Sequence, residues 1–242
     1  MKNHLNIILI SITILISVFI TTNTYNNRNR SNDIINVTGL GKKDFKSDLI
    51  VWSGYFSKIK LDLKTAYQAL KTDRENIKQY LVSKGVNEKE ILFSSVDINK
   101  KFDSYYDKEN VRHNVFLGYH LIQSVTIESK EVEKIESVSR EITELINLGI
   151  EFSSYSPEYY YTKLAELKIE MIAAATEDAR IRAEKIAENA GAKTGKLRYA
   201  RMGIFQIIAQ NSNEDYSWGG AFNTSSKMKT ATITMKLQFG IK

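Results

Sequence analysis

The sequence predicts an α+β fold in which antiparallel sheets, built from hairpins, pack against amphipathic helices, one of them long and rich in alanine. Hydrophobic residues make up 43% of the 242 residues and charged residues 26%, a composition that can bury a core. Runs with the alternation of strands are followed by runs with apolar residues every three or four positions. This succession of hairpin and helix is repeated along the chain, which indicates antiparallel sheet covered by helices.

Charge and cysteine content exclude several classes of function. The net charge is +6, but the 34 basic residues are dispersed among 28 acidic ones and form no block of five or six. A nucleic-acid interface needs clustered basic residues, so we expect no nucleic-acid partner. The chain has no cysteine, which excludes disulfides, thiolate metal sites, cysteine nucleophiles and a lipidated N-terminal cysteine.

The N-terminus carries a signal for export. Residues 5–20 (LNIILISITILISVFI) hold no charge, and their length lies between that of a signal-peptide core and that of a membrane-spanning helix. We expect residues 1–22 to be a signal peptide or a membrane anchor, and the missing A-x-A cleavage motif slightly favours the anchor. Residues 23–32 are then a flexible tether, and residues 33–242 form one folded domain outside the cytoplasm.

The first folded elements are a predicted hairpin and a helix. Residues 35–41 and 49–56 have strand character and are expected to pair with each other. Residues 62–84 carry apolar side chains at helical spacing, and Gly85 stands where a left-handed cap ends a helix.

A second hairpin and a second helix follow. Residues 91–102 and 115–127 are predicted strands, joined by the polar loop DSYYDKENVR. Residues 131–148 form the next amphipathic helix, which Gly149 ends.

The last third of the chain contains the longest helix. Residues 150–161 hold the only proline, Pro157, which favours an edge strand or a break within one. Residues 162–190 contain no glycine or proline and place alanines along one face, so that the helix backbone can lie close to its neighbour. Residues 196–209 and the alternating residues 230–239 are predicted strands.

Two glycine-containing segments resemble phosphate-binding loops but fail as such. In Gly191–Leu197, a Walker A loop would need glycine instead of Ala190 and a hydroxyl instead of Leu197, and the segment leaves a helix rather than entering one. We expect Gly191 to cap the helix. The pair Gly39 and Gly41 lacks the third glycine of a dinucleotide fingerprint and is interpreted as a softened strand or a bulge.

No constellation of catalytic or metal-binding residues emerges. His113 and His120 are seven apart in a predicted strand and should point to opposite faces. Glu177 and Asp178 are adjacent on a helix, diverge by about 100 degrees and are expected to lie on a solvated surface, with Asp178 pairing with Arg182. We therefore expect no enzymatic activity, no metal site and no cofactor.

An aromatic loop is the candidate interface. Aromatic rings give large contact area at low entropic cost, and two glycines can hinge such a loop. The alternative is that the loop folds onto the body with its tryptophan in the core. The candidate interface residues are Tyr216, Trp218, Gly219, Gly220 and Phe222.

Three stretches resemble the SIMPL-domain proteins of bacterial envelopes. They are INVTGLGKKDFKSDLIVWSG, the helix AYQALKTDRENIKQYLVSKGV with the following EKEILFSSVDI, and the alanine-rich KLAELKIEMIAAATEDARIRAEKIAENAGAKTGKL. The chain has Ser47-Asp48 where members commonly carry Pro-Asp, which suggests an atypical branch. The resemblance implies an exported periplasmic or envelope protein with no established catalytic residues. Some members form ring- or channel-like homo-oligomers, and some are linked to oxidative-stress tolerance.

Two functions follow from these expectations. The first is a non-enzymatic exported envelope protein that acts through self-assembly or partner binding, with a homo-oligomer expected and membrane contact through the N-terminal segment. The alternative is a periplasmic small-ligand-binding protein, with a pocket between helices and sheet lined by tyrosines. A hydrolase would require two buried carboxylates that converge in a cleft.

Overall fold

The computed structural model describes residues 2–29, 33–212 and 219–242, and it confirms the α+β class. Its helices are α1 (Lys2–Asn29), α2 (Leu63–Ser83), the 3-10 helix η2 (Glu88–Glu90), α3 (Val132–Glu141), the 3-10 helix η3 (Ile142–Leu148) and α4 (Leu164–Asn189). Its strands are β1 (Ile34–Lys46), β2 (Leu49–Lys60), β3 (Ile91–Phe93), β4 (Asp97–Tyr106), β5 (Arg112–Ser129), β6 (Phe152–Ser154), β7 (Glu158–Tyr160), β8 (Thr194–Met202), β9 (Gln206–Ala209) and β10 (Met228–Ile241).

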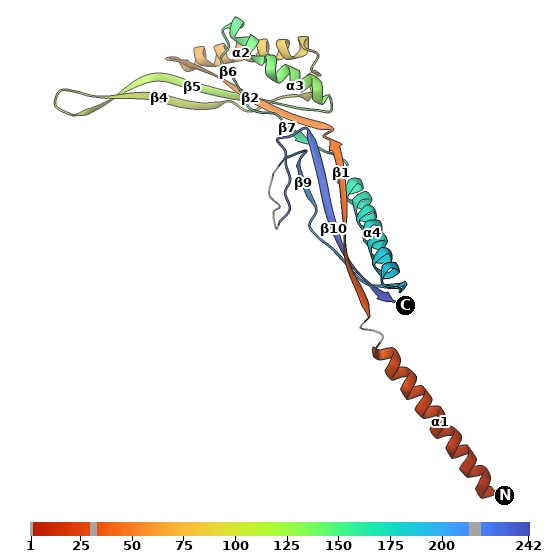
Figure 1. The fold of residues 1–242 in the computed structure, drawn as a ribbon. Coiled ribbons are helices and arrows are strands. Elements are labelled where there is room, and N and C mark those ends of the chain that lie inside the picture. Colours follow the sequence, from red (N-terminus) through yellow and green to blue (C-terminus); the bar gives the residue numbers. More distant parts are fainter. Residues whose placement is uncertain (1, 30–32, 213–218) are drawn as a thin grey trace.

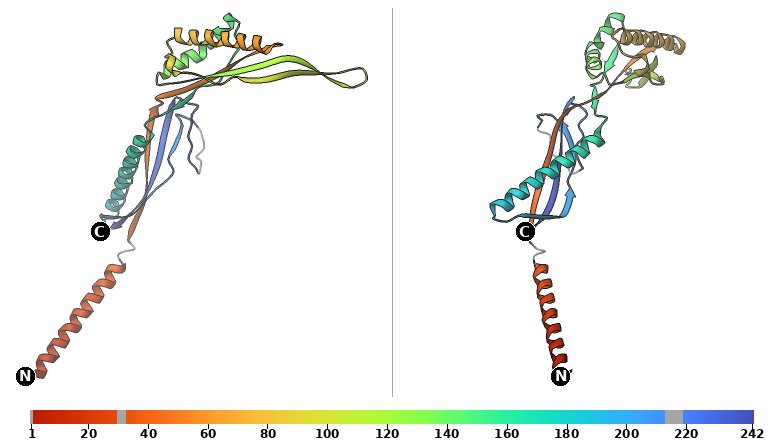
Figure 2. Two further views of the ribbon diagram at one scale, coloured as in Figure 1. Left: turned by 180° about the vertical axis from the view of Figure 1, so that it is seen from behind. Right: turned by 90° about the vertical axis from the view of Figure 1, so that its right-hand side faces the viewer.

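The strands form two antiparallel sheets, each with its own helices (Figure 1). Sheet A has the order β1-β10-β8, with β9 also paired to β10, and α4 packs along it. Sheet B has the order β3-β5-β2-β6, with β4 also paired to β5 and β7 to β2, and α2 and α3 cover it. In the right-hand view of Figure 2, α4 crosses in front of the strands of sheet A, and the long hairpin of β4 and β5 is seen end on.

The expected hairpin between the first two strands is wrong. β1 pairs with β10, from Ile34 opposite Gly240 to Lys46 opposite Met228, whereas β2 pairs with β5. The two residues between them do not close a turn: the Ser47 N–H donates to the Lys227 carbonyl and the Asp48 N–H to the Tyr160 carbonyl. Ser-Asp also lacks the glycine that two-residue hairpin turns favour. The chain therefore passes from one sheet directly into the other.

The second predicted hairpin and the three predicted glycine caps, Gly85, Gly149 and Gly191, are confirmed. β3 and β4 each pair with β5. Gly149 and Gly191 have φ of 71° and 72°, the left-handed conformation that ends η3 and α4. The predicted helix over residues 131–148 is α-helical only to Glu141 and then tightens into η3.

Two of the later predictions are refined. The segment around Pro157 breaks into the short strands β6 and β7, which pair with different parts of β2. Residues 196–209, expected as one strand, divide into β8 and β9, which pair with different ends of β10.

Each body has a separate hydrophobic core. In sheet B, Trp52, Phe56 and Leu121 are buried beneath Leu70 and Ile77 of α2, together with residues of α3. The sheet A core joins apolar residues of β1 and β10 to one stripe of α4, and its members all lie within residues 35–239. Neither core includes any of the α1 side chains that the structure describes. The α4 residues in the stripe are Leu167, Met171, Ala175, Ala179, Ala183 and Ala187.

Helix α4 lies against the backbone of β1. A Cβ atom at Gly39 would lie 2.0 Å from the Ala175 carbonyl oxygen, and one at Gly41 would lie 2.5 Å from the Met171 carbonyl oxygen. The two glycines therefore serve close helix–strand packing, which small residues on both elements allow.

The N-terminal helix includes the first part of the predicted tether, residues 23–32. α1 continues through residues 23–29, and the hydroxyls of Thr21, Thr22 and Thr24 donate to carbonyls one turn back, which satisfies polar side chains within a helix. Residues 30–32 of the tether lie outside the described part. In the part of the chain that the structure describes, no helix is long and apolar enough to cross a membrane.

Candidate interaction site

The hairpin of β4 and β5 extends beyond sheet B as a two-stranded arm (Figures 1 and 2). The last residue pair between β2 and β5 joins Lys60 to Tyr119, and the part of β5 that precedes it pairs with β4 alone. We call residues 101–118 the arm. A two-stranded ribbon has no second layer of its own, so its side chains meet solvent on both faces.

One carboxylate organises the tip of the arm. Asp107 Oδ1 accepts hydrogen bonds from the backbone N–H groups of Glu109 and Val111, each at 2.9 Å, and Oδ2 lies 2.6 Å from His113 Nε2. Asn110 takes the left-handed conformation, with φ of 63°. The hydrogen bond from His113 is the main reason that the pKa of Asp107 is lowered. The turn is thus a defined structure.

The arm exposes an unusual amount of apolar surface. Phe102 and Phe116 contact each other edge to face at 5.5 Å between ring centroids, and Phe102 is still 56% exposed. Patches of this kind in soluble proteins mark binding sites. The sequence predicts most of this segment as a polar loop, although it holds a phenylalanine and two tyrosines within five residues, a signal of exposed aromatic surface. The exposed large hydrophobic residues of the arm are Phe102, Tyr105, Tyr106, Val111, Val115, Phe116 and Leu117.

A bulge in β5 overturns the expectation for the two histidines. The register changes between Lys101 opposite Gly118 and Phe102 opposite Phe116, so one extra residue stands in β5. This bulge returns His113 and His120 to the same face of the ribbon. They lie opposite Tyr105 and Asn99, which are six residues apart on β4. The two histidines are therefore about 20 Å apart along the strand and cannot share a metal ion.

The predicted aromatic interface is only partly described. Tyr216 and Trp218 lie outside the described residues. Gly220 has φ of 89°, and Phe222 is 50% exposed. The backbone on either side of Phe222 is hydrogen-bonded to Ile207 of β9. The described end of this loop thus runs along the edge of sheet A.

The two neighbouring carboxylates of α4 have separate partners. Glu177 pairs with Arg180, and Asp178 pairs with Arg182 at 2.9 Å, which confirms the predicted pair. Asp178 Oδ2 also accepts the backbone N–H of Leu40 at 2.8 Å, a contact that lowers its pKa and that helical spacing did not predict. Asp178 therefore ties α4 to β1.

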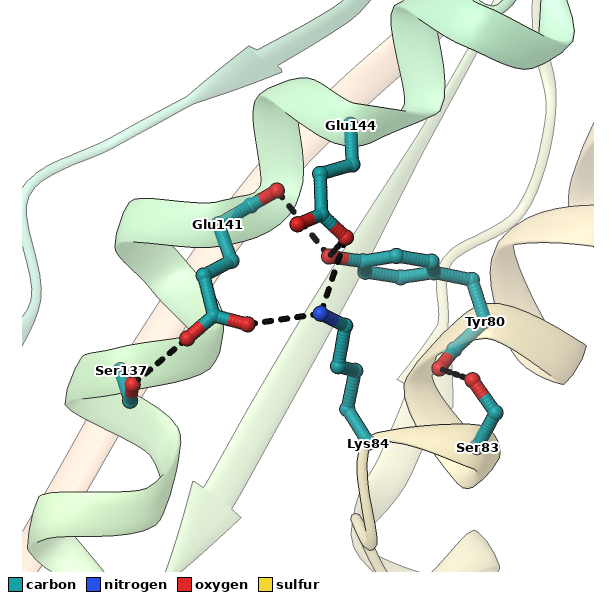
Figure 3. Close-up of polar contacts among 6 residues, drawn as sticks. All are labelled: Tyr80, Ser83, Lys84, Ser137, Glu141 and Glu144. Carbon is teal, nitrogen blue, oxygen red and sulfur yellow. Dashed lines mark hydrogen bonds and ion pairs between the residues drawn. The ribbon is translucent and has the colours of Figure 1, made fainter.

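A polar cluster joins α2 to α3 and η3 (Figure 3). Lys84 Nζ lies 2.7 Å from Glu141 and 2.9 Å from Glu144, and the Tyr80 hydroxyl donates to the Glu141 carbonyl oxygen at 3.0 Å. The hydrogen bonds that Lys84 donates, first to Glu141 and then to Glu144, hold the pKa of Lys84 well above its usual value. A lysine that keeps its proton is no general base, so this cluster clamps the two helices together.

A cavity of about 560 Å³ lies where β10 passes from its partner β8 to its partner β9. Arg201, Lys236 and Thr234 contribute to its wall, and no tyrosine does. Its volume is in the range of small-ligand sites. It lies along strands of sheet A, whereas the expected tyrosine-lined pocket was between helices and sheet.

These features define an α+β protein of two helix-covered sheets with a projecting hairpin. No group of three or more histidine and acidic side chains able to hold a metal ion occurs in residues 2–29, 33–212 and 219–242. The family model described as "SIMPL: Protein of unknown function (DUF541)" matches residues 35–239, so the chain belongs to the SIMPL family. No relative was found among curated proteins.

Proposed function

We propose that this chain is a non-enzymatic, exported envelope protein that acts by associating with copies of itself or with partner proteins. The observation that carries the proposal is the arm, which ends in a hydrogen-bonded turn and exposes a group of aromatic and aliphatic side chains to solvent. An ordered apolar surface of this kind is stabilised when a partner removes it from water. The loop that ends in Gly219, Gly220 and Phe222 remains a predicted second contact.

Export rests on the uncharged residues 5–20. Mass spectrometry of the mature N-terminus distinguishes a cleaved signal peptide from a retained anchor, and fractionation of cells tests the envelope location. A role in tolerance of oxidative stress is a further part of this proposal and is tested by exposing a deletion strain to peroxide.

Residues 33–242 are expected to be oligomeric in solution, and shortening the arm should reduce the number of chains in the oligomer. The shortened chain replaces residues 103–115 by Asn-Gly, which favours a tight hairpin turn. Because no residue of this segment belongs to either core, its thermal unfolding should match that of the unshortened chain. Multi-angle light scattering measures the mass of both. A monomeric unshortened chain at every accessible concentration would contradict self-assembly.

The alternative is small-ligand binding at the cavity between β8 and β9. Two cationic side chains, Arg201 and Lys236, in its wall favour an anionic ligand. A ligand at 100 times its dissociation constant adds about 2.7 kcal/mol of stability. A thermal-shift screen of small anions therefore tests this alternative, and an unchanged unfolding temperature with all of them counts against it.

A further inference from the structure

Strand β4 leaves one edge open. It pairs with β5 on one side, and no strand of residues 33–212 and 219–242 pairs with its other side. Every residue from Asp97 to Tyr106 is exposed. The open edge of a strand presents backbone N–H and C=O groups that a further strand can pair with.

We propose that the open edge of β4 pairs antiparallel with β4 of a second copy of this chain, about a two-fold axis that passes through Phe102. The inference rests on the proposed self-association and specifies which surface performs it. In this register Phe102 faces Phe102 of the second copy. The result is one continuous sheet in the order β5-β4-β4-β5 across the two arms.

The charges of β4 are complementary in this register. Lys101 faces Asp103 of the second copy, and the symmetry repeats the pair on the other side of the axis. Opposite charges directly across two strands stabilise a sheet, and like charges destabilise it. Centring the pairing on Lys101 or on Asp103 instead would place two lysines or two aspartates opposite each other. Of these three neighbouring centres, only Phe102 avoids both conflicts. The like charges that this register does oppose, Asp97 and Asp107, lie at the strand ends, where the Asp107 carboxylate accepts hydrogen bonds from its own turn.

The two faces of the paired arms differ in chemistry. Ile98, Phe102 and Tyr106 lie on one face of β4, with Lys100 and Ser104 between them, and Ile98 would face Tyr106 of the second copy. Phe116 lies opposite Phe102 on this face, so the existing ring pair extends to a row of four rings. Lys101 and Asp103 lie on the other face. A four-stranded sheet with this row of rings on one face is more stable than two separate two-stranded ribbons.

One backbone N–H group at the free edge of β4 already has a hydrogen-bond partner within its own chain. The Ser104 backbone N–H donates to Asp103 Oδ1 at 2.8 Å. In the paired arms a backbone carbonyl of the second copy takes this N–H group, and the Asp103 carboxylate turns to Lys101 of that copy. The two copies thus exchange two local contacts, one in each, for a ladder of backbone bonds and two ion pairs.

The charge pairs provide the first test, on residues 33–242. Lys101→Asp and Asp103→Lys each place like charges opposite one another and should each weaken self-association about tenfold. An equimolar mixture of the two variants should associate again, because each copy then offers the charge that the other lacks. Recovery in the mixture also shows that both variants are folded. Undiminished self-association of either single variant, or no recovery in the mixture, overturns the proposal.

Cysteine cross-linking of the full chain provides the second test, since the natural sequence has no cysteine. Phe102→Cys places the Cα atoms of two cysteines about 5.5 Å apart at the axis, a separation that a disulfide can bridge. Asn99→Cys is the matched control, because its two copies lie about 20 Å apart in this register. Oxidation should yield a disulfide-linked dimer with Phe102→Cys only.

The two tests separate this inference from the proposed function. If light scattering shows oligomers but Phe102→Cys forms no more dimer than Asn99→Cys, the inference is wrong and assembly proceeds through another surface. If the natural chain is monomeric, both the inference and the proposed self-assembly are wrong.

Discussion

Replacing Gly39 by valine is expected to lower the free energy of unfolding by on the order of 3 kcal/mol, because an oversized side chain in a tight packing site strains backbone on both sides. A Cβ atom at this position would lie 2.0 Å from the Ala175 carbonyl oxygen and 2.6 Å from the Ala179 amide nitrogen. Both atoms belong to the helix backbone and cannot rotate away. Helix α4 must therefore shift off the strand, which opens the core of sheet A.

Denaturant unfolding of residues 33–242 measures this effect. Thr38→Val is the matched control, since it places the same β-branched side chain on the exposed neighbour. Because the two cores share no residue, hydrogen exchange should accelerate mainly in β1, β10 and α4 of the Gly39→Val chain. Equal stability of the two variants would show that α4 does not rest on β1 as described.

The parts of the fold that the sequence predicted are those set by local patterns. The alanine stripe of α4 and the left-handed Gly191 both depend on spacing within one helix. The pairing of β1 could not be predicted from the sequence, because its partner β10 lies at the other end of the chain and no turn links the two strands. Strand alternation alone does not distinguish a neighbouring partner from a distant one.

The candidate site was missed for a related reason. The middle of the arm was predicted as a polar loop, and nothing local shows that β2 stops at Lys60 while β5 continues. Besides the aromatic residues of the arm, Gly118 was an available signal, since a glycine within a strand often marks a bulge. Its φ of 133°, and the 2.5 Å that would separate its Cβ from the Lys60 carbonyl oxygen, explain why glycine stands there.

The junction between the two sheets contains a buried lysine. Lys229 of β10 is 1% exposed, and its Nζ donates to the Tyr159 carbonyl oxygen of β7. Burial lowers the pKa of Lys229 to about 8 from an ordinary value of 10.5. Charging this side chain in the folded protein is therefore costly at neutral pH, while the unfolded chain carries the same charge in water.

The stability of residues 33–242 is consequently expected to rise by about 2 kcal/mol between pH 7.5 and 9.5, because one pKa unit corresponds to about 1.4 kcal/mol. In this window the unfolded state still binds the lysine proton that the folded state has released, so stability increases with pH. The window ends below the ordinary tyrosine pKa. This matters because burial raises the pKa of Tyr80 and Tyr159, and their titration would act in the opposite direction.

Lys229→Met should abolish this rise, because a neutral side chain has no proton to release. At pH 7.5 two changes oppose each other: the cost of a buried charge disappears, and the Tyr159 carbonyl loses its donor. The slope against pH is therefore the decisive measurement, obtained from urea unfolding at several pH values. Lys236→Met, on an exposed position of the same strand, should keep the slope. An equal slope in the natural chain and in Lys229→Met would show that Lys229 stays charged in the folded junction and that burial there is incomplete.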